Sequence, residues 1–506
     1  MKPIISNEDL RRVERITMHT QGIGALELME RAGHGCAERI LDLEKDGRLG
    51  HEPSYVVLTG MGNNGGDGLV VARHLLQAGK HVRVVLVMHR STPSPEQEAQ
   101  LEGLTKMGID PLVVKDLIGG VEFLENEVVI DAILGSGADR PLEGWLRDLV
   151  AKVNASDNRV IAIDLPTGMP DVGALLVEHA CIQAQHTLTF ELPRLNFLFP
   201  EAGECLGAWQ LVPIGLDKAA LGLVDQVGNW VEAKDVSELL RPRPRFGHKG
   251  TFGHGLIVAG WEGFHGAGVL SAQGCARSGV GLFTVHAPLA TIQALNTALP
   301  DAMTSVASAD FSGLPDLARF SALGIGPGIG TGHGAVQLVE EVLTHWTGPM
   351  VVDADALTIL FSRPDLAARI PPKAILTPHP KEMDRLLGQP SPSGYDRLLL
   401  TKAFASQHNC HVVLKGAYTA ICTPDGRVFF NSTGNVGMAK GGSGDVLTGL
   451  LTGLLAQGYG PLEASLIGTH LHGAAGDLAG TSLGMDAMRP SDLVAFLPAA
   501  WQMLRS

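Results

Sequence analysis

Two glycine-rich turns, each carrying an aspartate, hold the residues best suited to chemistry. One turn runs from Gly60 to Gly68 (GMGNNGGDG) and the other from Gly441 to Asp445 (GGSGD). Each opens a helix-like run, so the backbone amides of a helix N-terminus would gather beside a carboxylate. Glycine allows a phosphate or sugar to approach the main chain within hydrogen-bond distance. Asp67 and Asp445 suit either helix capping or proton transfer, and two such turns predict two separate ligand sites.

More polar side chains follow strand-like runs in the first half of the chain. Residues 63–67, 131–140 and 164–171 all come directly after such runs. Ligands bind outside the carboxyl ends of parallel strands, so we expect these three segments to meet at one crevice. The side-chain oxygens of Asn64, Asp131 and Thr167 could coordinate a hard monovalent cation. Asp164 is the local candidate for acid/base work, with a capping role as the alternative.

The second half offers groups suited to a nucleotide. Lys415 to Thr419 closes a strand with a cation and hydroxyl donors, although a strand-end lysine can also be merely solvated. His379 lies between two prolines, a stiff presentation that favours a ligand contact. The Gly441–Asp445 amides could stabilise a transferring phosphoryl group while Asp445 accepts a proton, and the alternative is a plain capping turn. The sequence contains no P-loop motif, so phosphates must be held another way.

The elements that must position these residues alternate between buried strands and helices. In the first half we expect strands at 54–59, 81–88, 128–131 and 160–164; after residue 248 the alternation restarts with strands at 255–260, 281–286, 322–325, 349–353, 374–377, 410–415, 418–422 and 428–430. This pattern predicts an α/β protein with parallel sheets covered on both faces. We interpret the amphipathic stretch 9–37 as packing and the segment 214–245 as an irregular connector. The predicted domains are residues 1–224 and 225–506.

Composition excludes several functional classes. The 506 residues carry 39 basic and 53 acidic side chains, a net charge of -14, which argues against general nucleic-acid binding. Six scattered cysteines predict buried free thiols and a reducing cytoplasm. We expect no membrane span and no export signal, because no unbroken apolar run reaches the necessary length.

The glycines at 60, 62 and 65 formally match a dinucleotide-binding fingerprint. That match is weak because no acidic residue closes the following strand to bind a ribose. An ordinary hydride-transferring domain is therefore disfavoured.

Taken together, four segments of the first half resemble the NAD(P)H-hydrate epimerases: Gly60–Gly68, Leu28–Gly33, Asp131–Gly137 and Asp164–Gly168. The resemblance implies a Rossmann-like domain that binds a hydrated nicotinamide dinucleotide and a potassium ion. By matching positions, Asn64, Asp131 and Thr167 would hold K⁺, with Thr167 replacing the more usual serine, and Asp164 would act as the catalytic residue. The substrate would also contact Asn63, Asn64, Gly65, Gly66, Asp67, Gly135, Ser136, Gly137, Ala138, Asp139, Arg140 and Pro141.

A second series of motifs resembles the ADP-dependent NAD(P)H-hydrate dehydratases of the ribokinase-like fold. The series comprises residues 248–253, 326–328, 353–357, 377–380, 415–416 and 434–445, in family order. The resemblance implies that Ala267 or Gly268, Gly326, His379 and Asp445 face the substrate, with Asp445 catalytic. Lys415, Gly416, Ala417, Tyr418, Thr419 and Gly444 would hold the adenine nucleotide.

The whole chain thus resembles the bifunctional bacterial repair enzymes. This resemblance implies epimerisation of NADHX and NADPHX and ADP-dependent dehydration to NADH or NADPH, with release of AMP and phosphate. Magnesium is inferred from the nucleotide chemistry, and a cytoplasmic homo-oligomer is expected. One alternative is a ribokinase-like kinase for a vitamin precursor. Another is a first domain that only binds ligands and has no catalytic role.

Overall fold

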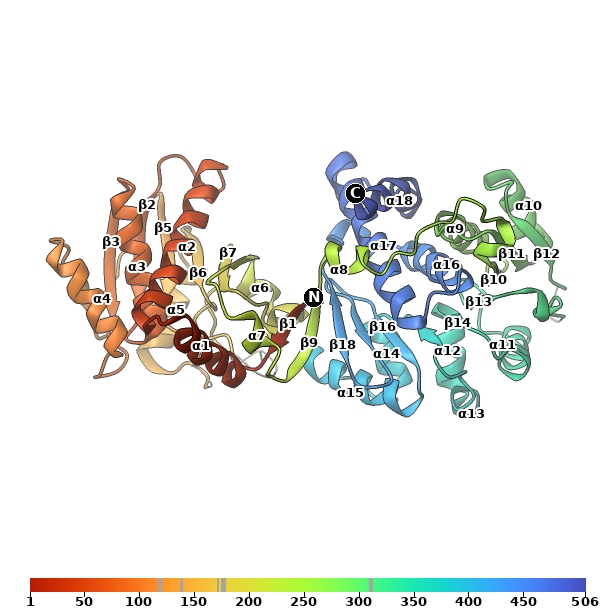
Figure 1. Ribbon diagram of the computed structural model, residues 1–506, viewed down its shortest axis with the longest axis horizontal. Helices are drawn as coiled ribbons and strands as arrows, with labels where there is room; N and C mark the ends of the chain where they lie inside the picture. Colours follow the sequence, from red (N-terminus) through yellow and green to blue (C-terminus); the bar gives the residue numbers. More distant parts are fainter. Residues whose placement is uncertain (117–120, 137–139, 171–172, 174–178, 309–312) are drawn as a thin grey trace. The chain divides into compact units, whose positions relative to one another are not determined.

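The computed structural model spans residues 1–506 and describes all of them except 117–120, 137–139, 171–172, 174–178 and 309–312. The chain divides into two compact units, Lys2–Val227 and Gly228–Ser506, with Met1 grouped with the second (Figure 1). Within the described residues no helix has the length and apolar character needed to cross a membrane.

The first unit is built on a parallel sheet. Its described strands follow the order β4-β3-β2-β5-β6-β7-β8, and every neighbouring pair is parallel. The strands are β2 (Ser54–Thr59), β3 (Val82–Val87), β4 (Leu112–Val114), β5 (Glu127–Ala132), β6 (Arg159–Ile163), β7 (His186–Phe190) and β8 (Ala208–Val212). A further strand, β1, covers Lys2–Ile5.

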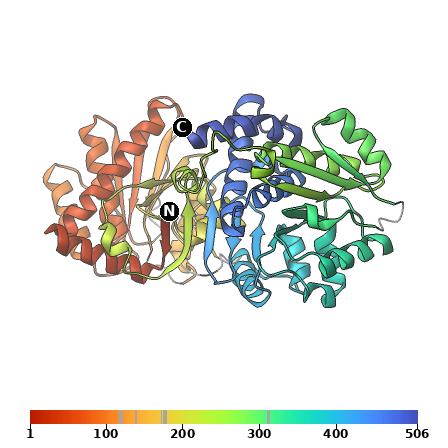
Figure 2. The ribbon, with the colours of Figure 1, turned by 45° about the vertical axis from the view of Figure 1, so that its right-hand side comes forward.

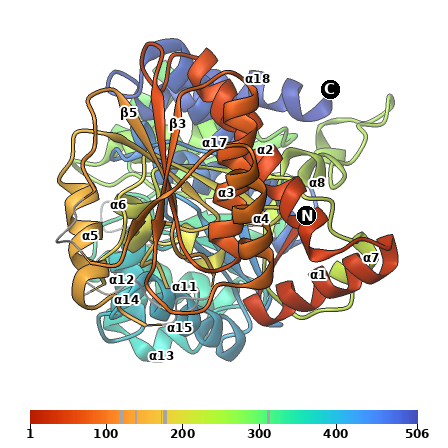
Figure 3. The same cartoon turned by 90° about the vertical axis from the view of Figure 1, so that its left-hand side faces the viewer.

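Helices cover both faces of this sheet because its central strands are apolar on both sides. Figure 3 shows α2 (Ala25–Lys45), α3 (Asn63–Gln77) and α4 (Pro95–Lys106) on one face and α5 (Gly144–Asn154) on the other. Helix α1 (Asn7–Gln21) begins after Ser6, whose hydroxyl accepts a hydrogen bond from the Asp9 amide. The short helix α6 (Gly203–Leu206) lies between β7 and β8 in the sequence, and α7 (Lys218–Leu221) follows β8.

The second unit contains a larger sheet with the order β9-β18-β17-β16-β15-β14-β13-β10-β11-β12. Strand β17 is antiparallel to both neighbours, and the other described pairings in this series are parallel. The strands are β9 (Gln226–Val231), β10 (His254–Val258), β11 (Leu282–Ala287), β12 (Met303–Val306), β13 (Ala322–Ile325), β14 (Met350–Val352), β15 (Ile375–Leu376), β16 (His411–Leu414), β17 (Ala420–Cys422) and β18 (Val428–Asn431).

The longer helices of this unit lie on the two sides of its sheet. Helices α9 (His265–Arg277), α16 (Ser443–Ala456), α17 (Pro461–Leu483) and α18 (Pro490–Arg505) group on one side, where α16–α18 pack against the sheet's apolar strands (Figures 1 and 2). The opposite side carries α11 (His333–His345), α12 (Ala354–Ser362), α13 (Pro364–Ala367), α14 (Pro380–Leu386) and α15 (Gly394–Gln407). The remaining helices are α8 (Ala233–Ser237) and α10 (Leu289–Ala298).

Helices α9 and α16 touch backbone to backbone, because glycines face each other at their crossing. A β-carbon on Gly449 would lie 1.8 Å from the carbonyl oxygen of Ser271, and one on Gly274 would lie 2.2 Å from that of Val446. Such contacts leave no room for any side chain. They fix α16, and therefore both of its ends, against the neighbouring helix.

The predicted α/β class and the predicted strands are confirmed, whereas the prediction of an irregular connector at 214–245 is wrong. That segment holds α7, β9 and α8, and β9 pairs in parallel with β18. Gly228 and Asn229 weaken the local strand signal, yet Trp230 and Val231 are buried, so tertiary pairing decides the conformation. All six cysteines are buried and free, as predicted.

Candidate active sites

In the first unit, a cavity of about 470 Å³ opens at the carboxyl ends of β2, β5 and β6. Six of the predicted substrate residues line it: Asn63, Asn64, Asp67, Gly135, Ser136 and Asp164. The three polar segments that the sequence placed after strands therefore do meet at one crevice.

Asp164 is held in a strained and well-defined position in this cavity. It directly follows β6 with a φ of 62°, in the left-handed region that costs a non-glycine residue energy. One carboxylate oxygen accepts a hydrogen bond from Nη2 of Arg194 at 2.7 Å, and the other accepts one from the Ser136 amide at 3.3 Å. Arg194 also donates to Asn7 at 2.5 Å. The buried ion pair orients the Asp164 carboxylate toward whatever fills the cavity.

Two more carboxyl groups share the cavity with Asp164. Burial, and then the charge of Asp164, raise the pKa of Asp67 well above its usual range. The same two causes raise the pKa of Glu14, which α1 contributes. A cluster of one arginine-paired carboxylate and two carboxyl groups with a raised pKa can both remove and supply protons. The sequence predicted only packing for residues 9–37, and that prediction is incomplete because α1 also lines the cavity.

The three predicted cation ligands lie together beside this cavity. The Thr167 hydroxyl donates to Oδ1 of Asp131 at 2.6 Å, and the Thr167 amide donates to Oδ2 at 2.7 Å. Asn64 donates its side-chain amide to the Leu134 carbonyl at 3.0 Å, which leaves its buried Oδ1 without a partner among the described residues. Burial raises the pKa of Asp131 to about 6. An orphaned amide oxygen beside a carboxylate and a hydroxyl fits a monovalent cation.

Several predicted substrate residues do not line the first cavity. A β-carbon on Gly65 would lie 2.1 Å from the Gly60 carbonyl oxygen, and one on Gly66 would lie 2.5 Å from the Met29 side chain, so both glycines allow close packing of the turn. Arg140 and Pro141 are exposed and are absent from the lining residues. Gly137, Ala138 and Asp139 lie outside the described residues.

In the second unit, a cavity of about 820 Å³ lies where β14 and β16 end and α16 begins. All the predicted nucleotide residues, Lys415 to Thr419 and Gly444, line it. His379 and Asp445 line it as well.

The start of α16 is shaped by glycine. Gly442 has a φ of 105°, a conformation that strains any residue with a side chain. At Gly444 a β-carbon would lie 3.3 Å from Nζ of Lys415, so glycine allows the cation to approach the helix N-terminus. Helix amides and a lysine therefore concentrate positive charge at one point of the cavity wall.

Lys415 belongs to a buried ionic network. Its Nζ donates to Oδ1 of Asp353 at 2.9 Å, and the Thr448 hydroxyl donates to Oδ2 of Asp353 at 2.7 Å. Burial alone would lower the pKa of Lys415, but Asp353 and Glu382 outweigh it, and the pKa is raised. The lysine therefore stays charged at neutral pH and is held by partners other than Asp445.

Asp445 has the properties of a general base. Burial, and then repulsion from Asp353, raise its pKa to about 7. A carboxylate with this pKa exchanges protons readily near neutral pH. The carboxyl group adjoins the amides of its own helix N-terminus, so base and anion-binding groups share one wall of the cavity.

Two histidines of the cavity have defined hydrogen bonds. Nδ1 of His379 accepts from the Glu382 amide at 3.2 Å, and Nε2 lies 3.6 Å from Oε1 of the same glutamate, so Glu382 holds the ring at the cavity wall. Nε2 of His472 lies 2.9 Å from the Ser443 carbonyl oxygen, and burial lowers the pKa of His472 to about 4. His472 is therefore neutral and supports the turn that opens α16.

Ala267, Gly268 and Gly326 do not line the second cavity. They lie at the carboxyl ends of β10 and β13, where a β-carbon on Gly326 would come within 1.8 Å of the Asp353 carbonyl oxygen. One on Gly268 would lie 2.9 Å from Thr291. They share the ligand-binding edge of the sheet with Asp353 but sit beside the cavity.

Sequence reasoning gave no site role to Glu14, Arg194, Asp353, Thr448 or His472, although the structure places all five in or beside the two cavities. Asp353 had a usable signal, because it directly follows β14, and Asp131 likewise lies at the carboxyl end of β5. Glu14 and Arg194 had none, since one lies in an amphipathic helix and the other in an irregular segment.

Comparisons with known proteins match both halves of the chain. A family model described as NAD(P)H-hydrate dehydratase matches residues 255–499, and one described as YjeF-related protein N-terminus matches residues 25–196. The chain is 35% identical to the bifunctional NAD(P)H-hydrate repair enzyme Nnr of Moorella thermoacetica, over 98% of this chain and 96% of that protein. It is 32% identical to the Escherichia coli K12 enzyme of the same name, over 97% and 92%.

Solved structures match the second half. A Bacillus subtilis ADP/ATP-dependent NAD(P)H-hydrate dehydratase, co-crystallised with ATP and Mg²⁺, is 33% identical with a TM-score of 0.50, covering 55% of this chain and 99% of its own. A ribokinase-like superfamily protein from Enterococcus faecalis V583 is 27% identical with a TM-score of 0.50, covering 56% and 98%. These matches confirm the ribokinase-like fold of the second unit.

The raised pKa of Asp445 predicts a pH-dependent effect on stability. Its folded value is about 7 and its ordinary value 3.8, so the stability that its proton contributes is complete below about pH 3.8 and lost as the pH rises through about 7. Asp445→Asn should therefore raise the midpoint of thermal unfolding, with a gain that grows from pH 5 to pH 8. The control is Asp486→Asn, which replaces an exposed aspartate and should leave the unfolding midpoint unchanged at both pH values. A gain that is equal at both pH values would contradict the raised pKa.

Proposed function

Because the chain belongs to the family of bifunctional NAD(P)H-hydrate repair enzymes, we propose that it converts both epimers of hydrated NADH and NADPH back to the intact dinucleotides. The first domain, residues 1–224, would interconvert the epimers, and the second, residues 225–506, would dehydrate one of them. The observation that carries the dehydration is Asp445 beside the N-terminal amides of α16, with Lys415 close by.

In the second domain the hydrate would give up its hydroxyl through phosphorylation. Asp445 would remove the proton of the hydroxyl at C6 of the nicotinamide ring while the oxygen attacks the β-phosphorus of ADP. The bond from that phosphorus to the bridging oxygen breaks, and AMP leaves. The amides of α16 and the Lys415 cation would stabilise the charge on the transferring group.

Elimination then restores the ring. The lone pair of the ring nitrogen would expel phosphate from C6, and loss of the proton at C5 would re-form the C5–C6 double bond. The products would be NADH or NADPH, AMP and phosphate. His379, which lines the cavity and is held by Glu382, would contact the substrate.

In the first domain the geometry around Asp164 suits proton exchange on two sides of a ring carbon. A protonated Asp67 or Glu14 would supply a proton to the departing hydroxyl, and the ring nitrogen would stabilise the resulting cation. Water would then add to the opposite face and lose its proton to Asp164. The ion pair with Arg194 would keep the Asp164 carboxylate oriented through these steps.

Two ions accompany the proposal. Asn64, Asp131 and Thr167 would hold K⁺, which would fix the loop beside the substrate and supply positive charge. Magnesium would arrive with the nucleotide phosphates, because the described residues include no group of three or more His, Cys, Asp or Glu side chains able to hold a metal ion. We also propose a homo-oligomer in the cytoplasm.

The alternative of a vitamin-precursor kinase is not favoured. The family model that matches the second half describes a dehydratase, and the relatives that span the chain are named as repair enzymes. A kinase would leave a stable phosphorylated product, whereas repair returns the dihydronicotinamide chromophore.

Asp445→Asn should abolish dehydration and leave nucleotide binding intact, because the amides and Lys415 remain while the base is lost. The measurement is the return of dihydronicotinamide absorbance from hydrated NADH with ADP, together with the Kd for ADP. We expect a loss of at least about a hundredfold in kcat, the usual contribution of a general base. Asp486→Asn is the matched control. Unchanged turnover in Asp445→Asn would remove this residue from the mechanism.

Asp164→Asn should block epimerisation without affecting dehydration of the preferred epimer. Each purified epimer is incubated with the protein in the absence of ADP, and the two forms are separated by chromatography. We expect interconversion at the spontaneous rate in Asp164→Asn and fast interconversion in the control Asp157→Asn, which replaces an exposed aspartate. Rapid interconversion by Asp164→Asn would contradict the assignment.

Potassium should stabilise the first domain through Thr167. Thermal unfolding in KCl should have a higher midpoint than in NaCl for the unchanged chain. Thr167→Val should lose this difference, because the hydroxyl ligand is gone, and Thr167→Ser should keep it. The same KCl effect in all three proteins would contradict the proposed site.

A further inference from the structure

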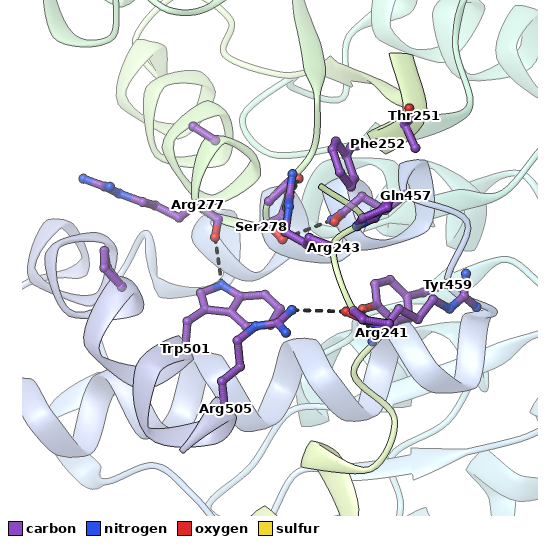
Figure 4. A pocket seen from close by; sticks show the side chains of 15 residues that line it. Arg241, Arg243, Thr251, Phe252, Arg277, Ser278, Gln457, Tyr459, Trp501 and Arg505 are labelled. Atoms are coloured by element: carbon purple, nitrogen blue, oxygen red, sulfur yellow. Dashed lines mark hydrogen bonds between the residues drawn. The ribbon is translucent and has the colours of Figure 1, made fainter. Parts of the chain in front are cut away.

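The second unit has another cavity, at the edge of its sheet opposite the nucleotide cavity. It measures about 460 Å³, and its walls include Phe252, just before β10, and Gly279, just before β11 (Figure 4). These positions lie at the amino ends of parallel strands, whereas the nucleotide cavity lies at the carboxyl ends. The two cavities also meet opposite ends of α16, one at Gln457 and the other at Ser443. No step of the proposed repair chemistry uses the cavity beside Phe252 and Gly279.

The cavity is positively charged in an acidic protein. Arg241, Arg243, Arg277 and Arg505 line it, and no carboxylate is found among its described lining residues. Glu463 pairs with Arg241 at 2.8 Å from outside the lining. In the part of the chain that the structure describes, the other three arginines have no ion-pair partner. The chain as a whole carries a net charge of -14, so the cavity has the opposite sign of charge to the protein that contains it.

Two of these arginines are held in place with donors to spare. Arg243 donates to the Gly279 carbonyl at 2.8 Å and lies over the Phe252 ring, 3.7 Å from its centroid. Arg505 donates to the Arg241 carbonyl at 3.4 Å and lies 5.5 Å from the centroid of Trp501. A guanidinium group has five N–H donors, so both can still bind a ligand. Figure 4 shows Arg277 extending away from the others, which places it at the rim.

A purely structural role does not account for all of this charge. Helices α9, α16 and α18 end around the cavity, and their C-termini carry partial negative charges that arginines stabilise. Each helix end is worth about half an elementary charge, so three together amount to roughly -1.5. Three arginines without a carboxylate partner carry twice that, and the cavity keeps a net positive charge.

We propose that this cavity binds a soluble small molecule that carries two or more phosphate groups. Arginine forks match phosphate oxygens in a bidentate manner, and two arginines with free donors, Arg243 and Arg505, suit more than one phosphate. The volume falls in the range of about 300–1,000 Å³ that small-ligand pockets occupy. A single recess on an acidic protein does not suit nucleic acid or an anionic membrane, both of which the overall charge repels.

The test uses inorganic triphosphate as the probe and isothermal titration calorimetry of the full chain. We expect the double variant Arg243→Gln with Arg505→Gln to lose one bound triphosphate, or to bind it about a hundredfold more weakly, since each arginine contributes about tenfold. The KM for ADP should be unchanged, which separates this site from the nucleotide cavity. The proposal would be overturned if the unchanged chain and the double variant bound the same number of triphosphates with the same Kd. It would also be overturned if the double variant lost as much affinity for ADP as for triphosphate.

Two controls keep the result specific. Arg319→Gln removes an exposed arginine of the same unit that does not line the cavity, and it should leave triphosphate binding unchanged. If the double variant has a lowered unfolding midpoint, Arg505→Gln alone, which loses one 3.4 Å hydrogen bond, should weaken binding about tenfold. A polyglutamate peptide that bound in place of triphosphate would assign the cavity to an acidic protein segment and overturn the proposal.

Discussion

The N-terminus of α16 is the feature on which the second unit depends, because it brings uncancelled amide dipoles to the carboxyl edge of a parallel sheet. Glycine at 442 and 444 makes that approach possible, and glycine at 449 presses the helix against α9. The helix therefore cannot retreat from the cavity. A phosphate there meets donors already in place, so little reorganisation opposes its binding.

In both sites a buried carboxylate forms an ion pair with a basic side chain. Lys415 balances Asp353 in one unit, and Arg194 balances Asp164 in the other. Breaking either pair would leave an uncompensated buried charge, which costs about 3–5 kcal/mol. In each unit another carboxyl group, Asp445 or Asp67, has a raised pKa and forms no ion pair with any residue that the structure describes. Burial of these carboxyl groups lowers the stability of the fold, and it also raises their pKa toward the range in which they can exchange protons.

The sequence predicted what is local and missed what depends on distant contacts. Buried strand runs and the glycine-aspartate turns are local patterns, so β5, β6, α16 and the acids beside them were found. Arg194 reaches Asp164 across 30 residues of sequence, and Glu14 enters the cavity from a helix with an ordinary amphipathic pattern. Strand β9 pairs in parallel with β18, a partner almost 200 residues away in the sequence that no local pattern could reveal. Gly65, Gly66 and Gly326 look like ligand contacts in a motif, yet their missing side chains make room for neighbouring backbone or side chains.

A crystal structure of the protein with ADP would test the central claim most directly. The account predicts that the β-phosphate accepts hydrogen bonds from the amides of Gly444 and Asp445, with Lys415 still paired to Asp353. A nucleotide whose phosphates lie away from the start of α16, or a Lys415 that leaves Asp353 to bind elsewhere, would contradict it.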